Sequence, residues 1–404
     1  MMPPASAGRA LPTFALGMFE ILSWGSSYYL LAVLAKPIAE ETGWPLTLVA
    51  GGQSLGLVVA GLLSPRIGKL IGWHGGRPVL LAGTAALALG LAMLGLSTGP
   101  LGFALAWILL GAGMGASLYD AAFATLGRLH GAAARRSITT VTLFGGFAST
   151  ACWPLSAFLL ERVGWRDTCL VYAALHVCLS VPLVLLASPR PPAQPLPEAA
   201  PAGPPPLHAG IRLSPGKQTA FRLLTVIVTL GGLISSLISV HLLTLLQAQG
   251  ISLAAAVTLG MLVGPAQVGA RVVEMAFGTH YHPIWTLISA TVLVAAGLAL
   301  LFLGFPLPAL ALLLYGAGNG IWSIARGTLP LALFGPADFP MLMGRLALPS
   351  QFAQAAAPAI GAYMLTTGGA HGTFALLCMV AGANFCAACL LFRTGVTERA
   401  DLAA

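Results

Sequence analysis

The stretches GAGMGASLYD (residues 111–120) and GAGNGIWSIAR (residues 316–326) are similar, and each lies within a long apolar segment of the chain. When they are aligned on their first glycine, Asp120 and Arg326 fall one position apart. An ionised side chain in the middle of a membrane helix costs about 2.5 to 3.5 kcal/mol unless it faces water or a partner. We therefore expect Asp120 and Arg326 to lie at the centre of the functional site.

The composition indicates a polytopic membrane protein. Hydrophobic residues make up 57% of the 404 residues, charged residues only 7%, and the mean hydropathy is +0.90. Soluble domains carry about 25% charged residues. Apolar stretches of about 20 residues, separated by short polar turns, predict an all-α fold with about twelve transmembrane helices. A membrane β-barrel would need alternating polar and apolar residues, which the sequence lacks.

The net charge of +8 sets the orientation of the chain in the membrane. If the N-terminus is cytoplasmic, most of the 19 Lys and Arg residues fall on cytoplasmic turns and tails, while Lys36, Arg162 and Arg166 lie outside. This bias predicts that both termini are cytoplasmic. Since topology accounts for the basic charge, we expect no nucleic-acid partner.

The sequence offers no chemistry typical of an enzyme. The six cysteines fall in apolar segments, and Cys386 and Cys389 form a CxxC pair without a second pair or a nearby histidine. Packing is the expected role of such cysteines, so we predict no metal and no cofactor. We also find no pairing of a nucleophile with a base and no phosphate-binding loop, which argues against an enzyme.

A helix predicted over residues 11–38 carries an acid and aromatic side chains on one face. Glu20, Trp24 and Tyr28 recur every four residues and so share that face. This pattern is typical of the lining of a polar cavity. Alternatively, Glu20 is close enough to the cytoplasmic end of the helix to reach the membrane surface.

Three further segments carry polar groups inside the predicted membrane region. A helix beginning near Pro308 has the most polar face in the chain, formed by Asn319, Trp322, Ser323 and Arg326. His241, in a helix predicted over residues 220–247, could titrate near neutral pH, although a lone histidine is more often a packing residue. Arg271 and Glu274 are three residues apart and are predicted to pair at the cytoplasmic rim.

Residues 188–218 are rich in proline and show no apolar period. Such a composition predicts an extended cytoplasmic linker. It divides the chain into two predicted six-helix bundles, residues 1–187 and residues 219–404. This boundary is expected in a fold built from two parallel repeats.

The turn GKLIGWHGGRPVL at residues 68–80 resembles a loop of the major facilitator superfamily, whose pattern is G-x-L-x-D-R-x-G-R-K-x-x-L. The matching positions are Gly68, Leu70, Gly75, Arg77 and Leu80. The acid of the pattern is replaced by Gly72. In that family the loop forms a charge clamp on the cytoplasmic side, so the resemblance implies a gating loop that is weaker or differently built here. Apart from the resemblance, the segment is a short basic turn.

The resemblance implies two pseudo-symmetric six-helix bundles around a central cavity, lined by helices one, four, seven and ten. It places Glu20, Asp120, His241 and Arg326 on those four helices. The run Trp24 to Tyr29 and the turn Glu41 to Trp44 are also similar to bacterial relatives of the monocarboxylate porters. That narrower resemblance implies a multi-pass protein of the bacterial inner membrane. We expect the protein to be a monomer.

The combined expectation is a secondary active transporter for a small organic solute, such as a carboxylate, that works by alternating access with proton coupling. Arg326 would hold the anionic group. The other predicted substrate-binding residues are Trp24, Tyr28, Asn319, Trp322 and His241. Asp120 or Glu20 would carry the proton.

Three alternatives remain open at this point. Asp120 and Arg326 could form a fixed bridge that serves only as a gate. The protein could instead export a drug-like compound or a metabolite in exchange for protons. It could also be a membrane receptor that shares the fold without transporting a solute.

Overall fold

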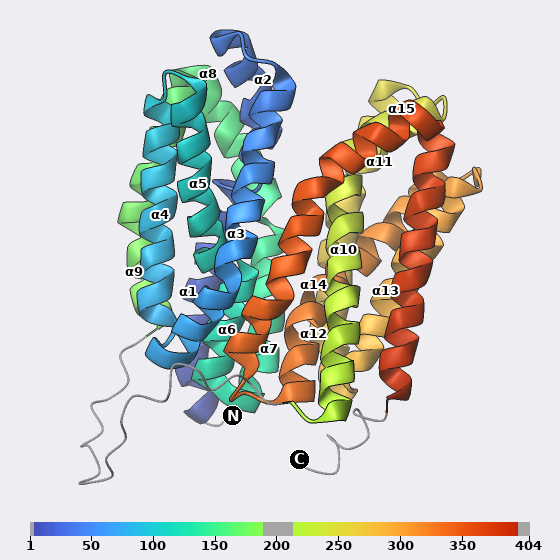
Figure 1. Cartoon of the computed structure of the whole chain (residues 1–404). Coiled ribbons are helices and arrows are strands. Elements are labelled where there is room, and N and C mark those ends of the chain that lie inside the picture. Colours follow the sequence, from blue (N-terminus) through green and yellow to red (C-terminus); the bar gives the residue numbers. More distant parts are fainter. Residues whose placement is uncertain (1–3, 189–212, 395–404) are drawn as a thin grey trace.

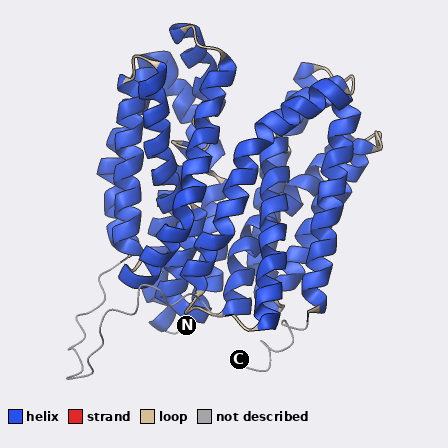
Figure 2. Cartoon of the chain, viewed as in Figure 1, coloured by secondary structure: helices blue, strands red, loops and turns tan. Residues whose placement is uncertain are grey.

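The computed structural model describes residues 4–188 and 213–394, which contain helices and no strand (Figure 2). The first part of the chain forms α1 (Pro4–Gly25), α2 (Leu31–Thr42), α3 (Leu46–His74), α4 (Gly76–Leu96), α5 (Pro100–Ser117), α6 (Tyr119–His130), η1 (Gly131–Ala133), α7 (Ala134–Gly146), α8 (Ala148–Leu175), the π-helix η2 (His176–Ser180) and α9 (Val181–Ala187). The second part forms α10 (Pro215–Ala248), α11 (Leu253–Gly260), α12 (Val263–Phe277), η3 (Gly278–His280), α13 (Pro283–Phe302), α14 (Pro308–Phe334) and α15 (Phe339–Arg393).

Within the described residues, eight helical stretches are long and apolar enough to cross a membrane by length and composition. Some of these stretches contain more than one pass. Gly164 has a φ of 78° and turns the chain inside α8, and Gly369 has a φ of 63° and turns it inside α15. Figure 1 shows α15 rising from near the middle of the molecule and folding back along its edge. Both turns need a left-handed backbone, which glycine adopts without strain.

Helices α1–α9 gather on one side of the molecule and α10–α15 on the other (Figure 1). The start of α1 and the end of α15 lie at the same end. One buried apolar cluster, which includes Phe123 of α6, Leu329 of α14 and Phe339 of α15, draws on both sides. Gly127 packs directly on the Phe339 ring. We call this region, with the start of α1, Gly127 and Phe339, the packed end, and the opposite region, with α2 and α11, the far end.

The two sides approach each other backbone to backbone where α3 crosses α15. A Cβ atom at Gly68 would lie 2.4 Å from the Pro340 carbonyl oxygen, and one at Gly344 would lie 2.3 Å from that of Ser64. The two backbones therefore touch, which is possible only because both helices present glycine. The predicted gating residue Gly68 is thus part of the contact between the two sides.

The helix predicted over residues 11–38 is interrupted, so its prediction as one continuous helix is wrong. Residues 26–30 form a turn between α1 and α2. The Ser26 and Ser27 hydroxyls donate to the carbonyls of Leu22 and Ser23, at 2.7 and 2.5 Å. Hydroxyl groups that bond to the preceding turn in this way commonly bend helices.

A second interruption lies at Leu118, where an extended residue (ψ −176°) separates α5 from α6. It places Asp120 in the first turn of α6. Most of the predicted linker, residues 189–212, lies outside the described residues. Helix α10 begins at Pro215, inside the segment predicted as linker, because proline is well suited to the first turn of a helix.

Candidate functional site

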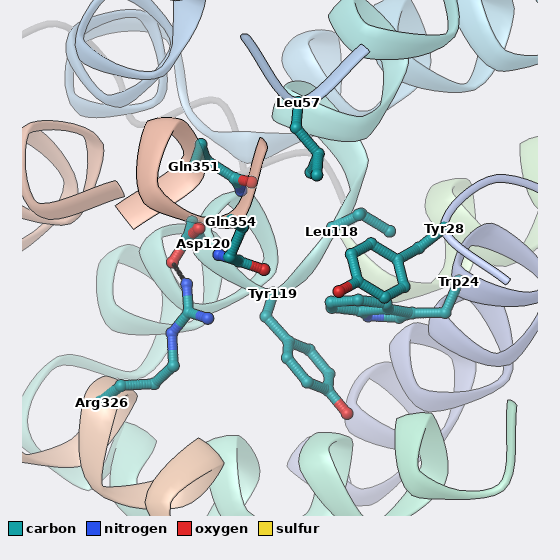
Figure 3. A pocket seen from close by; sticks show the side chains of 9 residues that line it. All are labelled: Trp24, Tyr28, Leu57, Leu118, Tyr119, Asp120, Arg326, Gln351 and Gln354. Carbon is teal, nitrogen blue, oxygen red and sulfur yellow. Dashed lines mark hydrogen bonds and ion pairs between the residues drawn. The ribbon is translucent and has the colours of Figure 1, made fainter. Parts of the chain in front are cut away.

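Asp120 and Arg326 form an ion pair between α6 and α14. The Arg326 Nη2 donates to the Asp120 Oδ1 (Figure 3), and the side chains are only 14% and 7% exposed. Because Asp120 lies in the first turn of α6, the partial positive charge of the helix N-terminus also stabilises its carboxylate. The sequence placed these residues near each other, and the structure shows that they pair directly.

A narrow pocket adjoins the ion pair. It is lined by Trp24, Tyr28, Leu57, Leu118, Tyr119, Asp120, Arg326, Gln351 and Gln354 (Figure 3). The room that remains between these side chains is about 10 Å³, on the order of the space that one water molecule needs. In this conformation the pocket is therefore closed to an organic substrate.

Glu20 is fully buried beside the pocket, so the alternative that it reaches the membrane surface is wrong. Its Oε2 accepts a hydrogen bond of 2.8 Å from the Trp24 Nε1. Its Oε1 has no hydrogen-bond partner in the described part of the chain. Burying a carboxylate with a single donor is costly. Glu20 is therefore suited to carry a proton.

The aromatic residues of the predicted helix face meet in the pocket. The Trp24 ring lies 5.1 Å from the Tyr28 ring and 4.9 Å from the Tyr119 ring, measured between centroids. On α14, Trp322 lies under Arg326, whose Cζ is 5.4 Å from the indole centroid. The structure thus places Trp24 and Tyr28 with the ion pair, and Trp322 directly behind it.

Two predicted substrate-binding residues lie elsewhere in the structure. The Nε2 of His241 is 3.0 Å from the Pro358 carbonyl oxygen, and its ring packs on Gly361 of α15. Asn319 is half-buried on α14. Neither residue lines the pocket beside the ion pair, as the chain is described. Their roles in substrate binding stay predictions.

Arg271 of α12 is a buried cation that the sequence interpretation misplaced. It does not pair with Glu274, whose carboxylate instead accepts from the Tyr281 and Thr286 hydroxyls, at 2.5 and 2.7 Å. Arg271 is 5% exposed, and its Nε donates to the Gly320 carbonyl at 3.2 Å. Its Nη1 has no hydrogen-bond partner among the described residues. The signal that could have found it is the one that singled out Arg326, a charge within an apolar segment.

Comparison with known proteins identifies the family. A sequence model of the Major Facilitator Superfamily matches residues 13–330. The chain belongs to the Major Facilitator Superfamily. It is accordingly a membrane transporter and not an enzyme. Among curated proteins, none matches this chain.

Solved structures of Major Facilitator Superfamily proteins share its fold. The human organic anion transporter MFSD10 is 18% identical, with 96% of this chain and 100% of that chain covered and a TM-score of 0.71. The proton:xylose symporter XylE is 13% identical, with 96% of both chains covered and a TM-score of 0.70. The transporter FucP in its outward conformation is 14% identical, with 95% of this chain and 99% of that chain covered and a TM-score of 0.71.

The superfamily loop at residues 68–80 is held together without the acid of the family pattern. Gly75 has a φ of 84° and joins α3 to α4, which explains the glycine at this position. Arg128 of α6 donates to the backbone carbonyls of Gly72 and Trp73, the latter at 3.3 Å. Backbone carbonyls thus accept from the arginine in place of a side-chain carboxylate. Arg77 lies half-buried at the start of α4, and the gating role of Gly68, Gly75 and Arg77 stays a prediction.

A second arginine joins the two sides of this superfamily member at the packed end. Arg135 of α7 donates to the carbonyl oxygens of Gly278 and Tyr281, the latter at 2.8 Å. The Tyr281 phenol in turn donates to Glu274, and burial together with this hydrogen bond raises the pKa of Tyr281 to about 12. The phenol therefore keeps its proton at physiological pH. Glu274 and Tyr281 fix the turn whose carbonyls Arg135 binds.

Proposed function

We propose that this transporter moves a small organic anion, such as a carboxylate, by proton-coupled alternating access. The observation that carries the proposal is the charge balance of two buried arginines, of which Arg326 lines the pocket and Arg271 lies against Gly146 of α7. Asp120 neutralises Arg326, whereas Arg271 is buried with an unpartnered Nη1. A buried guanidinium without a carboxylate is costly, and an anionic substrate would supply the missing partner.

The two arginines would act together on the substrate. Arg271 lies on α12 and Arg326 on α14. The carbonyl of Gly320, six residues before Arg326 on α14, accepts from Arg271. Guanidinium groups bind carboxylates through paired hydrogen bonds. Trp24, Tyr28 and Trp322 would enclose the apolar part of the substrate. That one of the similar structures is an organic anion transporter supports this substrate class.

The coupling proton would be carried by Glu20 or Asp120. Glu20 has an oxygen with no partner in the described chain, and Asp120 is bound to Arg326. When the substrate engages Arg326, the Asp120 carboxylate loses part of its counter-charge, which favours protonation. Proton symport by XylE, which shares the fold, supports coupling to protons.

The proposed architecture is a monomer of twelve membrane crossings. Two pseudo-symmetric six-helix bundles, residues 1–187 and residues 219–404, would be joined by the linker of residues 188–218. The distribution of Lys and Arg supports cytoplasmic termini in a bacterial inner membrane. With that orientation the packed end is cytoplasmic, and the conformation is the outward one, as in FucP.

The decisive experiment begins with a thermal-shift screen of the purified protein against small carboxylates, amines and neutral solutes. A carboxylate that stabilises the protein is then tested for uptake into proteoliposomes under an inward proton gradient. We expect Arg271→Gln and Arg326→Gln to abolish the thermal shift, because each removes a cation from the site. Stabilisation only by amines or neutral solutes would contradict the anion hypothesis.

The interpretation of the ion pair as a gate alone is tested in the same assay. Arg326→Lys preserves the charge but not the paired donors of guanidinium. If the pair is only a gate, this variant keeps its carboxylate affinity. We expect instead that its KM rises at least about tenfold, the effect of losing about 1.4 kcal/mol of binding.

A second candidate function is proton-driven export. It is favoured by the aromatic and apolar walls formed by Trp24, Tyr28, Tyr119 and Leu57. Export by proton antiport predicts that inside-out vesicles with an acidic lumen take up the compound into the lumen as protons leave it. Symport predicts accumulation on the side toward which protons flow.

A further inference from the structure

Two irregular helical segments meet inside the first half of the chain, away from the pocket. One is the turn at residues 26–30, and the other is the π-helix η2 that begins at His176. The His176 Nε2 lies 2.7 Å from the Ser26 hydroxyl, and both side chains are fully buried. Short π-segments are rare and are frequent at functional sites.

Counting hydrogens assigns the protons in this contact. The Ser26 hydroxyl donates its single hydrogen to the Leu22 carbonyl at 2.7 Å, so it must accept from His176. The Nε2 of His176 therefore carries a hydrogen. Its Nδ1 lies 3.0 Å from the Ser180 hydroxyl, which donates to the ring nitrogen. The neutral Nε2–H tautomer thus satisfies all three buried side chains.

Ser26 lies on the opposite side of the chain from the pocket residues Trp24 and Tyr28. Successive residues of a helix are about 100° apart, so Ser26 faces roughly away from Trp24 and Tyr28. Trp24 and Tyr28 line the pocket (Figure 3), whereas Ser26 faces His176. The back of the turn is also tightly packed, because a Cβ at Gly25 would lie 2.1 Å from the Cys152 Sγ.

We propose that His176 is a positioning residue, whose hydrogen bond to Ser26 holds the turn at residues 26–30 so that Trp24 and Tyr28 stand in the pocket. The effect of His176 on substrate binding rests on the proposed function, whereas its hold on the turn at residues 26–30 does not. Loss of the bond would leave the turn free to shift, and the two aromatic side chains would shift with it.

The test uses two variants of similar size and polarity in the purified full-length protein. In His176→Gln the amide nitrogen can take the place of Nε2 and reach Ser26. In His176→Asn it can take the place only of Nδ1, so the bond to Ser26 is lost. Hydrogen exchange of the amides at residues 26–30 is followed by mass spectrometry. We expect exchange about fivefold faster in His176→Asn, the size typical of losing one buried hydrogen bond.

His176→Gln should stay within about twofold of the unmodified protein. Ser26→Ala removes the acceptor together with the bond to the Leu22 carbonyl, so exchange should be at least as fast as in His176→Asn, with no further increase when His176→Asn is added. This variant also decides the matter if His176→Asn does not fold. Equal exchange in the Gln and Asn variants, or an unchanged rate in Ser26→Ala, would overturn the proposal.

A transport readout separates this proposal from the proposed function. For a transported carboxylate, His176→Asn should raise KM while the maximal rate per folded molecule is kept, and His176→Gln should restore KM. If no carboxylate is transported, the proposed function fails, yet the exchange rates still decide the role of His176. A KM that is equal in both variants would contradict the link between the turn and the pocket.

Discussion

At the scale of single residues, the Asp120–Arg326 pair is costly to split. Both side chains are largely buried, so removing one charge leaves the other without its partner. We expect Asp120→Asn and Arg326→Gln each to destabilise the protein by about 3 to 5 kcal/mol. The double variant should recover most of this loss, because no unpaired charge remains. Thermal unfolding of the four proteins in detergent measures the coupling.

The matched control for this cycle is the exposed pair of Arg166 and Glu41. Their side chains are 35% and 52% exposed, with a distance of 2.9 Å. Exposed pairs contribute about 0.2 to 1 kcal/mol. Arg166 also donates to the carbonyls of Gly95 and Ser97, so only Glu41→Gln isolates the pair. Additive effects of Asp120→Asn and Arg326→Gln would show that the buried pair is not coupled.

The sequence predicted part of the site because charges inside apolar segments are few. Asp120 and Arg326 were found by this signal, and Trp24 and Tyr28 by their spacing from Glu20. Arg271 was missed because Glu274, three residues on, offered a plausible partner. The carbonyl that binds His241 could not be predicted, since it depends on how α10 and α15 are rotated against each other. Such rotations follow from packing rather than from local sequence.

At the scale of elements, we expect the crossing of α3 and α15 to hold the packed end closed. Gly68→Ala would place a Cβ 2.4 Å from the Pro340 carbonyl oxygen, which is backbone and cannot rotate away. We expect the helices to separate and the conformation to shift toward one that is open at this end. The measurement is the labelling rate of a single cysteine at Ser64, in a cysteine-free background, by a membrane-impermeant thiol reagent.

Gly72→Ala is the control for that crossing, because a Cβ at Gly72 would meet only the Met341 Cγ, at 3.7 Å. This is ordinary van der Waals contact, so the labelling rate of Ser64→Cys should not change. Equal labelling in the two alanine variants would show that the crossing does not close this end. Faster labelling only with Gly68→Ala supports the crossing as a structural latch.

The Arg135 contact with the turn at Gly278 and Tyr281 is a second link at this end. Its acceptors lie just after α12, where helix carbonyls lack partners and favour a cation. Arg135→Gln should therefore weaken closure, and we expect protection of residues 274–282 from hydrogen exchange to fall about tenfold. Arg136→Gln is the control, since Arg136 is exposed and carries the same charge. A similar loss of protection in both variants would show that removing any positive charge near this turn has the same effect, whether or not it binds the carbonyls.

The helix interruptions mark the limit of prediction at this scale. Apolar length predicted a helix over residues 11–38 and placed residues 111–120 inside a second apolar segment, and helices are there. The breaks at residues 26–30 and Leu118 were not predicted, because no proline lies at either site. Serine side chains that bond to the preceding turn explain the first break. For the second, the backbone geometry at Leu118 is clear, but no side-chain contact explains it.

At the scale of the whole molecule, composition alone predicted a helical membrane protein, and the family confirms a transporter. The arrangement of the two sides could not be predicted in the same way. Among the described residues, one buried apolar cluster draws many residues from both sides and lies at the packed end, a second lies in the first side and takes in Ala355 of α15, and a third lies within α10–α15. The conformation depends on how the stability of the contacts at the packed end compares with that of the contacts that would form at the far end. Local sequence patterns do not report this balance.

Alternating access makes a prediction about distances across the molecule. Spin labels at Thr47 and Ala254, both exposed, report the far end, and labels at Arg136 and His280, also exposed, report the packed end. If the two sides rock about the pocket, a bound carboxylate at low pH should shorten the first distance and lengthen the second.

Double electron–electron resonance measures the distributions of both distances. The two changes must be opposite in sign, because two rigid bodies that rock about a central site open at one end when they close at the other. Asp120→Asn/Arg326→Gln, which removes the ion pair, should shift the populations without ligand. Two distances that change in the same direction would indicate loosening of the fold, and unchanged distances with bound ligand would indicate binding without transport.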